Sequence, residues 1–182
     1  VDGGWWDDAD YLKEQIKQRG GHVSAWFLTH AHTDHVGALL NLLQSEADGE
    51  DTGITIDHIY YNFASLDWYK KHELGDLGTA DAILTALAGL PKGEACPVKK
   101  GDEILVDDVC ITVLNDRYEP DDDHVGERDG NDASMVYRML VNGVTILFTG
   151  DLQVDSGNHV LETVAKEDLK ADIVQMAHHG QH

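Results

Sequence analysis

The chain has 182 residues, with 34 acidic and 13 basic side chains, so its formal net charge is −21 when histidine is neutral. Apolar residues make up 42% and charged residues 26% of the chain, which is ordinary globular usage for one domain and argues against wholesale disorder. The negative charge repels phosphate backbones and disfavours extended nucleic acid as a partner, and no apolar run reaches the roughly 18 residues that span a bilayer.

Patterns of apolar residues and turn residues alternate along the chain. In chain order they predict a helix over 10–19, a strand over 23–28, a helix over 36–43, a strand over 54–63, a helix over 77–90, strands over 103–106 and 109–114, strands over 134–141 and 144–149 joined by Asn142-Gly143, a helix over 157–169 and a strand over 172–177. Strands in two groups with interspersed helices predict an α/β domain of sheets covered by helices.

The stretch from residue 116 to 132 contains eight acids, two arginines and almost no apolar side chains, so we expect a loop. It is either a solvated excursion or a lid that contacts substrate. The two cysteines, Cys96 and Cys110, are too few for a disulfide framework and are not spaced like a zinc knuckle. The sequence indicates no particular compartment or oligomeric state.

The most informative stretch is Thr29-His30-Ala31-His32-Thr33-Asp34-His35-Val36-Gly37, where potential metal ligands lie between a predicted strand and a helix. Residues i and i+2 of an extended segment project to the same side, so His30 and His32 can bind one ion together. Asp34 and His35, beyond the bend, can bind a second. A cluster of imidazoles without metal would repel one another as they protonate near pH 6.5, so the pattern predicts a metal site.

This run resembles the signature of the metallo-β-lactamase superfamily, and other segments agree in order. Asp2-Gly3-Gly4 resembles the end of an early strand in that family, and Phe148-Thr149-Gly150-Asp151 resembles the strand end whose carboxylate bridges two metal ions. Ala177-His178-His179-Gly180 resembles the terminal histidine ligand after the last strand. The resemblance spans positions 2–180. It implies an αββα sandwich with a two-metal cleft at the strand ends.

Both ends of the chain look cut, since it opens on what resembles a strand end and breaks off at the terminal motif. We therefore expect residues 1–182 to be a partial metallo-β-lactamase-like hydrolase domain that lacks its first strands and its C-terminal elements.

One segment departs from the typical family pattern. Typical members place a third histidine for the first ion upstream of the Gly-Asp, in a Gly-His-Thr context, whereas this chain has Gly130-Asn131-Asp132-Ala133-Ser134. This segment, together with His178-His179-Gly180 and Lys100-Gly101-Asp102-Glu103-Ile104, resembles the subgroup that includes the metallo-β-lactamase-like domain of ComEC and bacterial phosphorylcholine esterases. The first ion would then have fewer protein ligands and more room for water or substrate, and such a weaker site would favour manganese or be partly empty.

The resemblance also implies roles. Two divalent ions, zinc or manganese, about 3.5 to 4 Å apart would be bridged by Asp151 and a water, and would turn that water into the attacking hydroxide. His30 and His32 would bind one ion; Asp34, His35 and His178 would bind the other. Asp34 and Asp151 are the catalytic candidates, and without a second ion Asp34 would instead accept the proton.

Other polar residues are expected around the ions. Asp2 would hydrogen-bond to the free ring nitrogen of a ligand histidine. Because neighbours at a strand end point opposite ways, the ligand is either His178 or His179; the resemblance favours His178 and leaves His179 near the substrate. Asn131 and Ser134 either contact the site or stabilise a turn. Surface positions are expected for the isolated histidines: His22, His58, His72, His124 and His159, of which His124 lies in the acidic loop and could reach the cleft.

The function predicted from these patterns is a two-metal hydrolase acting on a phosphoester, either a phosphodiester or a small phosphomonoester. The charge favours a small substrate over a long polyanion. Two alternatives stay open. One is a thioester or lactam hydrolase of the same superfamily, which the absent Gly-His-Thr disfavours. The other is a metal-binding interaction domain without catalysis, which the complete ligand set for the second ion disfavours.

Overall fold

The computed structural model of the chain describes residues 1–119 and 129–181. Its strands are β1 His22–Val23, β2 Trp26–Phe27, β3 Thr55–Ile56, β4 Ile59–Tyr61, β5 Ala95–Pro97, β6 Glu103–Val106, β7 Val109–Val113, β8 Tyr137–Val141, β9 Val144–Phe148 and β10 Ile173–Val174. Its α-helices are α1 Ala9–Lys17, α2 Thr33–Ala47, α3 Leu66–His72, α4 Leu77–Gly89 and α5 Val154–Thr163, and its 3-10 helices are η1 Trp6–Asp8, η2 Gly130–Ala133 and η3 Ala177–Gly180.

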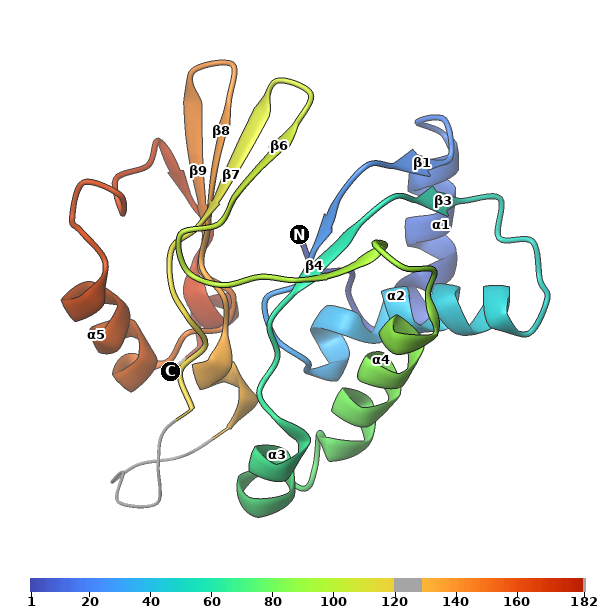
Figure 1. Cartoon of the computed structure of the whole chain (residues 1–182), viewed down its shortest axis with the longest axis horizontal. Coiled ribbons are helices and arrows are strands. Elements are labelled where there is room, and N and C mark those ends of the chain that lie inside the picture. The colour runs from blue at the N-terminus through green and yellow to red at the C-terminus, as the bar shows by residue number, and fades with distance from the viewer. Residues whose placement is uncertain (120–128, 182) are drawn as a thin grey trace.

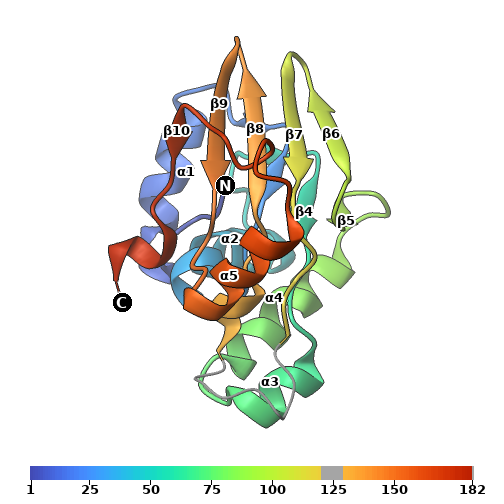
Figure 2. The ribbon, with the colours of Figure 1, turned by 90° about the vertical axis from the view of Figure 1, so that its left-hand side faces the viewer.

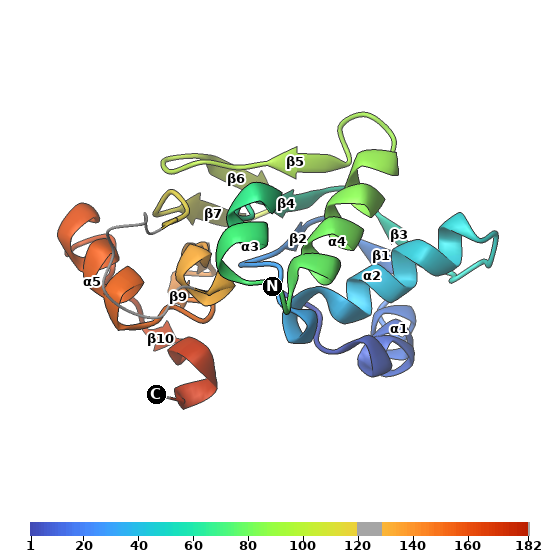
Figure 3. The same ribbon diagram turned by 90° about the horizontal axis from the view of Figure 1, so that it is seen from below.

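The strands form two facing groups. One sheet has the order β10-β9-β8-β7-β6 and is antiparallel except for the parallel pair of β10 and β9. The other has the parallel order β2-β4-β5, with the parallel pair β1-β3 beside it. Helix α5 covers the outer side of the first sheet, while α1, α2 and α4 cover the outer side of the second (Figures 1 and 3). This layering confirms the predicted α/β sandwich.

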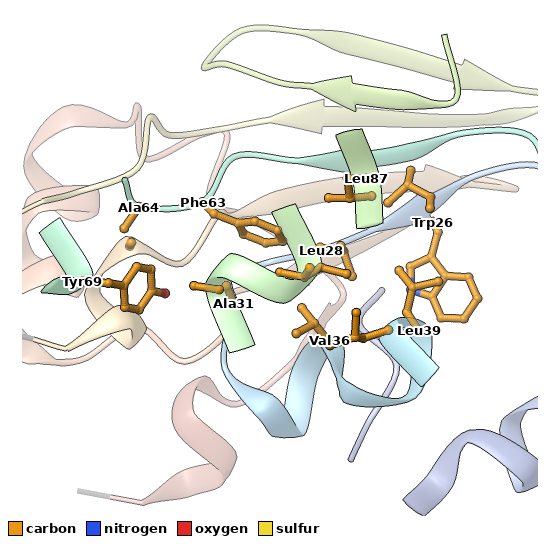
Figure 4. Close-up of a cluster of buried hydrophobic side chains, with 14 of the residues drawn as sticks. Trp26, Leu28, Ala31, Val36, Leu39, Phe63, Ala64, Tyr69 and Leu87 are labelled. Carbon is orange, nitrogen blue, oxygen red and sulfur yellow. The ribbon is translucent and has the colours of Figure 1, made fainter. Parts of the chain in front are cut away.

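Buried apolar side chains fill each of the three interfaces between layers. The cluster between the parallel sheet and its helices includes Leu28, Val36, Leu39 and Leu87, all essentially inaccessible to solvent (Figure 4). A second cluster, with Phe27, Ile111, Val113, Met135 and Tyr137, lies between the two sheets. The third cluster packs α5 on the antiparallel sheet through Leu147, Leu152, Val160 and Val164. The core therefore follows the layers expected for an αββα sandwich.

Tyr137 joins the two sheets directly. Its hydroxyl donates a 2.7 Å hydrogen bond to the carbonyl of Leu28, and its ring meets the edge of Phe27 at 5.2 Å between centroids. Phe27 in turn stacks on Tyr60 at 4.8 Å. These contacts hold the end of β2 against β8, and so fix the start of the segment that leads into the histidine cluster.

Most of the predicted elements are confirmed, but several differ in extent. The strand predicted over 172–177 is limited to β10, and the helix predicted over 36–43 is the longer α2. The strand predicted over 54–63 is two short strands, β3 and β4. They pair with β1 and β2, which are likewise separated by a break in the strand predicted over 23–28. The helix predicted over 157–169 is α5, Val154–Thr163, which starts earlier because Ser156 Oγ accepts a 3.0 Å hydrogen bond from the backbone N–H of Gln153. Strand β8 begins at Tyr137 rather than at residue 134.

One α-helix and one strand, α3 and β5, have no counterpart among the predicted elements. Helix α3 is capped by Ser65, whose Oγ accepts from the backbone N–H of Trp68 at 3.2 Å, and it buries Trp68 and Tyr69. Strand β5 pairs in parallel with β4. The view in Figure 2 shows α3 below the ends of the strands. This position brings the end of α3 near the histidine segment.

The acidic stretch is only in part a solvated loop. Residues 116–119 have no regular structure, but residues 130–133 form the 3-10 helix η2, which is buried. His124, the isolated histidine of this stretch, lies outside the described residues. Within the described ranges, no helix combines the length and apolar character needed to cross a membrane.

Candidate metal centre

The histidine segment lies where β2 gives way to α2. His30 is 1% exposed, and the backbone around it is held on two sides: the Leu28 N–H donates to Tyr60 O at 2.9 Å, and the Met135 N–H donates to Thr29 O at 2.9 Å. His32 is the N-cap residue of α2, so Asp34 and His35 fall in the first turn of the helix. The change from extended chain to helix thus turns successive side chains of the motif in different directions.

Asp151 follows β9 through a glycine that no other residue could replace without strain. Gly150 has φ of +54°, and a Cβ there would lie 2.8 Å from Ser134 Oγ and 2.9 Å from Thr29 Cβ. Beyond it, the backbone N–H of Asp151 donates to Ser134 Oγ at 3.0 Å. The side chain of Asp151 is thereby directed into the protein, where the residue is 2% exposed.

Four of the candidate side chains meet in one cluster, Asp34, His35, Asp151 and His179, whose potential ligand atoms all lie within 4.8 Å of one another. Asp151 Oδ2 is 3.2 Å from His35 Nε2 and 3.1 Å from His179 Nε2. Asp34 Oδ2 is 3.1 Å from His179 Nε2 and 3.6 Å from His35 Nε2. Segments that are far apart in the sequence therefore converge on one point.

His179 reaches this cluster through an unusual backbone turn. His178 and His179 both have positive φ, 47° and 52°, a left-handed conformation that costs a non-glycine residue on the order of 1–3 kcal/mol. The turn leaves the side chain of His179 beside Asp34 and Asp151, whereas His178 is not a member of the four-residue cluster. The structure thus places His179 in contact with both carboxylates, whereas the family resemblance favours His178.

His30 and His35 each have one ring nitrogen in a hydrogen bond outside the cluster. Asp2 accepts from His35 Nδ1 at 2.9 Å and from the Thr29 hydroxyl at 2.9 Å. Because that hydroxyl gives its hydrogen to Asp2, it accepts from His30 Nδ1, which is 3.0 Å away. The Nε2 atoms of His30 and His35 remain for a ligand inside the cluster. Nε2 of His32, by contrast, is 3.0 Å from Glu73 Oε1.

Glu73 belongs to a second group of potential ligands, with His32 and Asp76. It follows the last residue of α3, and its backbone N–H still donates to Tyr69 O at 2.8 Å. Its other carboxylate oxygen, Oε2, accepts a 2.6 Å hydrogen bond from the backbone N–H of Gly130. Glu73 was not predicted as a site residue, because an acidic residue at the end of a short helix gives no local signal of a contact with His32.

The carboxylates around His35 dominate its protonation. Burial lowers the pKa of His35, but hydrogen bonds with Asp151 and Asp2 raise it to about 10. Burial raises the pKa of Asp151, while His35, and after it His179 and His178, lower it below the ordinary value. Without metal, the centre therefore holds a protonated His35 beside the ionised carboxylate of Asp151.

His30 and His32 differ in the charges they face. Burial lowers the pKa of His32, yet the hydrogen bond and charge of Glu73 raise it above its usual value. Burial, followed by repulsion from His35 and His32, holds the pKa of His30 well below its usual range. His30 is consequently a neutral imidazole, the form that binds metal ions.

The chemistry of these donors fits divalent metal ions. In the part of the chain that the structure describes, His30 Nε2 and Asp151 Oδ1 are buried and have no hydrogen-bond partner. Such orphaned groups are costly in a folded protein, and metal coordination would satisfy both. Imidazoles and carboxylates are also the ligands that zinc and manganese use in proteins.

The remaining candidates lie at varied distances from this centre. Asn131 and Ser134 are buried, with Ser134 bonded to Asp151 and with Oδ1 of Asn131 free of hydrogen bonds within the described ranges.

The isolated histidines contact other partners: His22 pairs with Asp57 at 2.9 Å, His58 donates to Gly93 O at 2.9 Å, His72 lies against Trp68 and His159 stacks on Tyr118. His22 and His58 are exposed as expected, while His72 and His159 are half-buried.

Solvent reaches the four-residue cluster from one side. The side chains of His179 and Asp34 are 48% and 24% exposed, whereas those of His35 and Asp151 are 6% and 3% exposed. A substrate would therefore approach across His179 and Asp34. A hollow of about 1130 Å³ is lined by residues of α2, α4, β3 and β4, and neither group of clustered ligand residues lines it.

Comparison with known proteins points to one family. Residues 1–182 match the family model described as the metallo-beta-lactamase superfamily. Similar solved structures include Rm3 metallo-β-lactamase, at a TM-score of 0.53 and 16% identity over 97% of this chain and 66% of that one. MEM-A1, a subclass B3 metallo-β-lactamase from a soil metagenome library, gives 0.51 and 19% identity over 97% and 67%. A mutant metallo-β-lactamase from Cronobacter sakazakii gives 0.52 and 17% identity over 98% and 68%.

Other comparisons limit what these similarities mean. The chain spans 58% of the length of two further Cronobacter sakazakii metallo-β-lactamase structures that it matches. No curated protein matches it. At identities below one fifth, the solved structures show a shared fold and do not by themselves identify a substrate.

Proposed function

The chain belongs to the metallo-β-lactamase superfamily, and from this premise we propose that it is a metal-dependent hydrolase of small phosphoesters with a centre for two divalent ions. His30 and His32 would hold the first ion, and Asp34, His35 and His179 the second, with Asp151 shared between them. When bound, such ions act as Lewis acids and activate water near neutral pH. We assign the second-ion role to His179 because its Nε2 lies 3.1 Å from both Asp34 and Asp151.

The orphaned atoms support this ligand set. Nε2 of His30 and Oδ1 of Asp151 are both buried without partners within the described ranges, and they belong to segments that only the fold brings together. Asp2 and Thr29 keep the Nδ1 atoms of His30 and His35 occupied. Each imidazole therefore offers a defined nitrogen, as in metal centres whose ligands are oriented by outer hydrogen bonds.

The preference for a phosphoester depends on the segment Gly130-Asn131-Asp132-Ala133-Ser134. It supplies an amide and a hydroxyl where typical family members have a third histidine. With fewer protein ligands on the first ion, more positions are open to substrate oxygens. A phosphoester has two or more non-bridging oxygens that can occupy such positions, whereas a lactam has a single carbonyl oxygen. Two-metal sites commonly bind phosphoryl groups in this way.

The residues at the mouth of the centre are acidic or imidazole groups rather than arginines or lysines. With only the first ion bound, Asp34, which is half-buried and hydrogen-bonded to His179 Nε2 at 3.1 Å, would instead accept a proton on the solvent side. The net charge of −21 disfavours a long polyanion. A small ester that carries one or two charges fits both features.

The deciding experiment is a substrate panel on the purified protein reconstituted with zinc or with manganese. We expect metal-dependent turnover of bis-para-nitrophenyl phosphate or of para-nitrophenyl phosphate, and loss of that turnover after chelation. A chromogenic cephalosporin and a thioester test the alternatives within the superfamily. Turnover of either of these without phosphoester hydrolysis would reject the phosphoester proposal, and fewer than about one bound ion per chain would favour a non-catalytic domain.

A further inference from the structure

We propose that the side-chain oxygen of Asn131 is a further protein ligand of the first metal ion. It would join the two histidines and the shared carboxylate assigned to that ion above, so the inference rests on the proposed two-ion centre. An amide oxygen carries no net charge and is a donor of the kind that suits manganese. It is held less tightly than an imidazole or a carboxylate, which keeps its coordination position open to exchange with a substrate oxygen.

The side chain of Asn131 is buried and unsatisfied. The residue is 6% exposed, and within the described ranges its Oδ1 has no hydrogen-bond partner. A buried polar oxygen without a partner is costly and uncommon in folded proteins. A bound cation would supply the missing partner.

The backbone around Asn131 is fixed by hydrogen bonds within the 3-10 helix η2. The Asn131 N–H donates to Asp129 Oδ1 at 2.9 Å, and the Asn131 carbonyl accepts from the Ser134 N–H at 3.0 Å. The other oxygen of Asp129 accepts from Gln153 Nε2 at 2.7 Å. The amide is therefore presented by a rigid turn, as a metal ligand should be.

This turn is joined to the two segments that carry the other ligands. Ser134 Oγ accepts from the backbone N–H of Asp151 at 3.0 Å. The Met135 N–H donates to the carbonyl of Thr29, the residue before His30, at 2.9 Å. The segments of His30 and Asp151 also carry buried atoms without partners in the described part of the chain, Nε2 and Oδ1. Three neighbouring segments thus each contribute one unsatisfied donor atom for a metal ion.

The amide of Asn131 acts on His30. Burial is the main influence on the pKa of His30 and lowers it, while the side chain of Asn131 acts in the opposite direction. Because Nδ1 of His30 directs its hydrogen to Thr29, Nε2 has a lone pair and no hydrogen. Oδ1 of Asn131 is also only an acceptor. Two such buried acceptors repel each other, and a cation bound by both removes that repulsion.

The rival arrangement is an amide turned over, so that Nδ2 of Asn131 donates to Nε2 of His30. That bond would occupy the nitrogen that His30 offers to the metal ion. The two arrangements therefore exclude each other. They also differ in the expected effect of removing the amide, because its loss weakens metal binding in the first case and frees a ligand in the second.

The first test measures metal binding without substrate. Zinc and manganese affinities of Asn131→Leu, Asn131→Asp and the parent protein would be obtained by competition with a chelator, with bound ions counted by mass spectrometry. Asn131→Leu should weaken one ion by about 10-fold or more, at least the loss seen for residues that only orient a ligand, and leave the other unchanged. Asn131→Asp, which keeps an oxygen and adds a charge, should bind that ion more tightly than the parent protein.

The matched controls are Asn158→Leu and Asn158→Asp, since Asn158 is exposed on α5. Both should bind metal like the parent protein. Thermal unfolding of the metal-free variants separates a structural role, in which Asn131→Leu would lower stability and weaken both ions alike. That result would contradict the proposal.

The second test is a crystal structure of the zinc-loaded parent protein, which does not depend on the folding of any variant. We expect Oδ1 of Asn131 about 2.0–2.2 Å from the ion that His30 binds. An ion on His30 without Oδ1 in its coordination sphere would overturn the assignment.

The outcomes are separable from those of the proposed function. Two bound ions with Asn131 coordinated and no phosphoester hydrolysis would reject the phosphoesterase and leave this assignment standing. Unchanged or tighter metal binding in Asn131→Leu, or absence of bound metal in the parent protein, would reject the assignment.

Discussion

The carboxylate of Asp2 lies 2.9 Å from Nδ1 of His35, although 33 positions separate the two residues along the chain. The same carboxylate accepts hydrogen bonds from the backbone N–H of Thr29 at 2.8 Å and from the Thr29 hydroxyl at 2.9 Å, and Thr29 lies 3.0 Å from Nδ1 of His30. One half-buried acid at position 2 thus orients two of the proposed metal ligands.

Metal binding should release a proton from His35. Its pKa is raised to about 10 in the metal-free protein, so the ring is protonated at neutral pH and must become neutral to bind an ion. Affinity should rise by about tenfold per pH unit as pH increases toward that value. Calorimetry in buffers of different ionisation enthalpy would count the protons, and buffer-independent heats would contradict the prediction. In Asp2→Asn, one cause of the raised pKa is removed, so fewer protons should be released near pH 8.

Replacing Asp151 by Asn should abolish hydrolysis and weaken metal binding while the fold remains. Asp151 contacts both His35 and His179, and an amide offers a weaker ligand than a shared carboxylate. We expect turnover to fall on the order of 100-fold or more, measured with the phosphoester substrates. The exposed residue Asp81, on α4, provides the control Asp81→Asn, which should behave like the parent protein. Near-normal turnover in Asp151→Asn would rule out the bridging role.

The neighbours His178 and His179 give a paired test of the terminal ligand. Only His179 belongs to the cluster with Asp34 and Asp151. His179→Gln should therefore weaken metal binding by more than about 10-fold, which is the lower end of the loss expected when a residue that only orients a ligand is replaced. His178→Gln should weaken metal binding less. Chelator competition on both variants would measure the difference. The reverse order would restore His178, the choice that the family resemblance favours.

The core between α2 and the parallel sheet should dominate stability. Leu39 is fully buried in the cluster shown in Figure 4, so Leu39→Ala should lower the free energy of unfolding by about 2–5 kcal/mol. Leu105→Ala removes the same atoms from a residue that is 74% exposed and should change it by less than about 0.5 kcal/mol. Denaturant unfolding of both variants would show this contrast, and equal losses would contradict the assignment of the core.

The family and the layered fold were predictable from local patterns. Amphipathic spacing predicted α2, Gly89 and Pro91 marked the end of α4, and the Asn142-Gly143 turn predicted the hairpin of β8 and β9. The spacing of His30, His32, Asp34 and His35 was sufficient to predict a metal site, because four potential ligands within six residues stay near one another however the rest of the chain folds. The missed elements, α3 and β5, are short, and short segments have little periodicity to detect.

What only the tertiary structure decided is which residues from other segments complete the centre. Whether His178 or His179 faces Asp151 depends on two left-handed residues in η3, and no alternation rule for a strand end describes such a turn. The contact of Glu73 with His32 depends on where the end of α3 is docked and on the absence of a side chain at Gly130. The sequence determined the chemistry of the ligands because that chemistry follows from residue type and local spacing. Their outer partners required the fold, because packing between distant segments fixes the direction of each side chain.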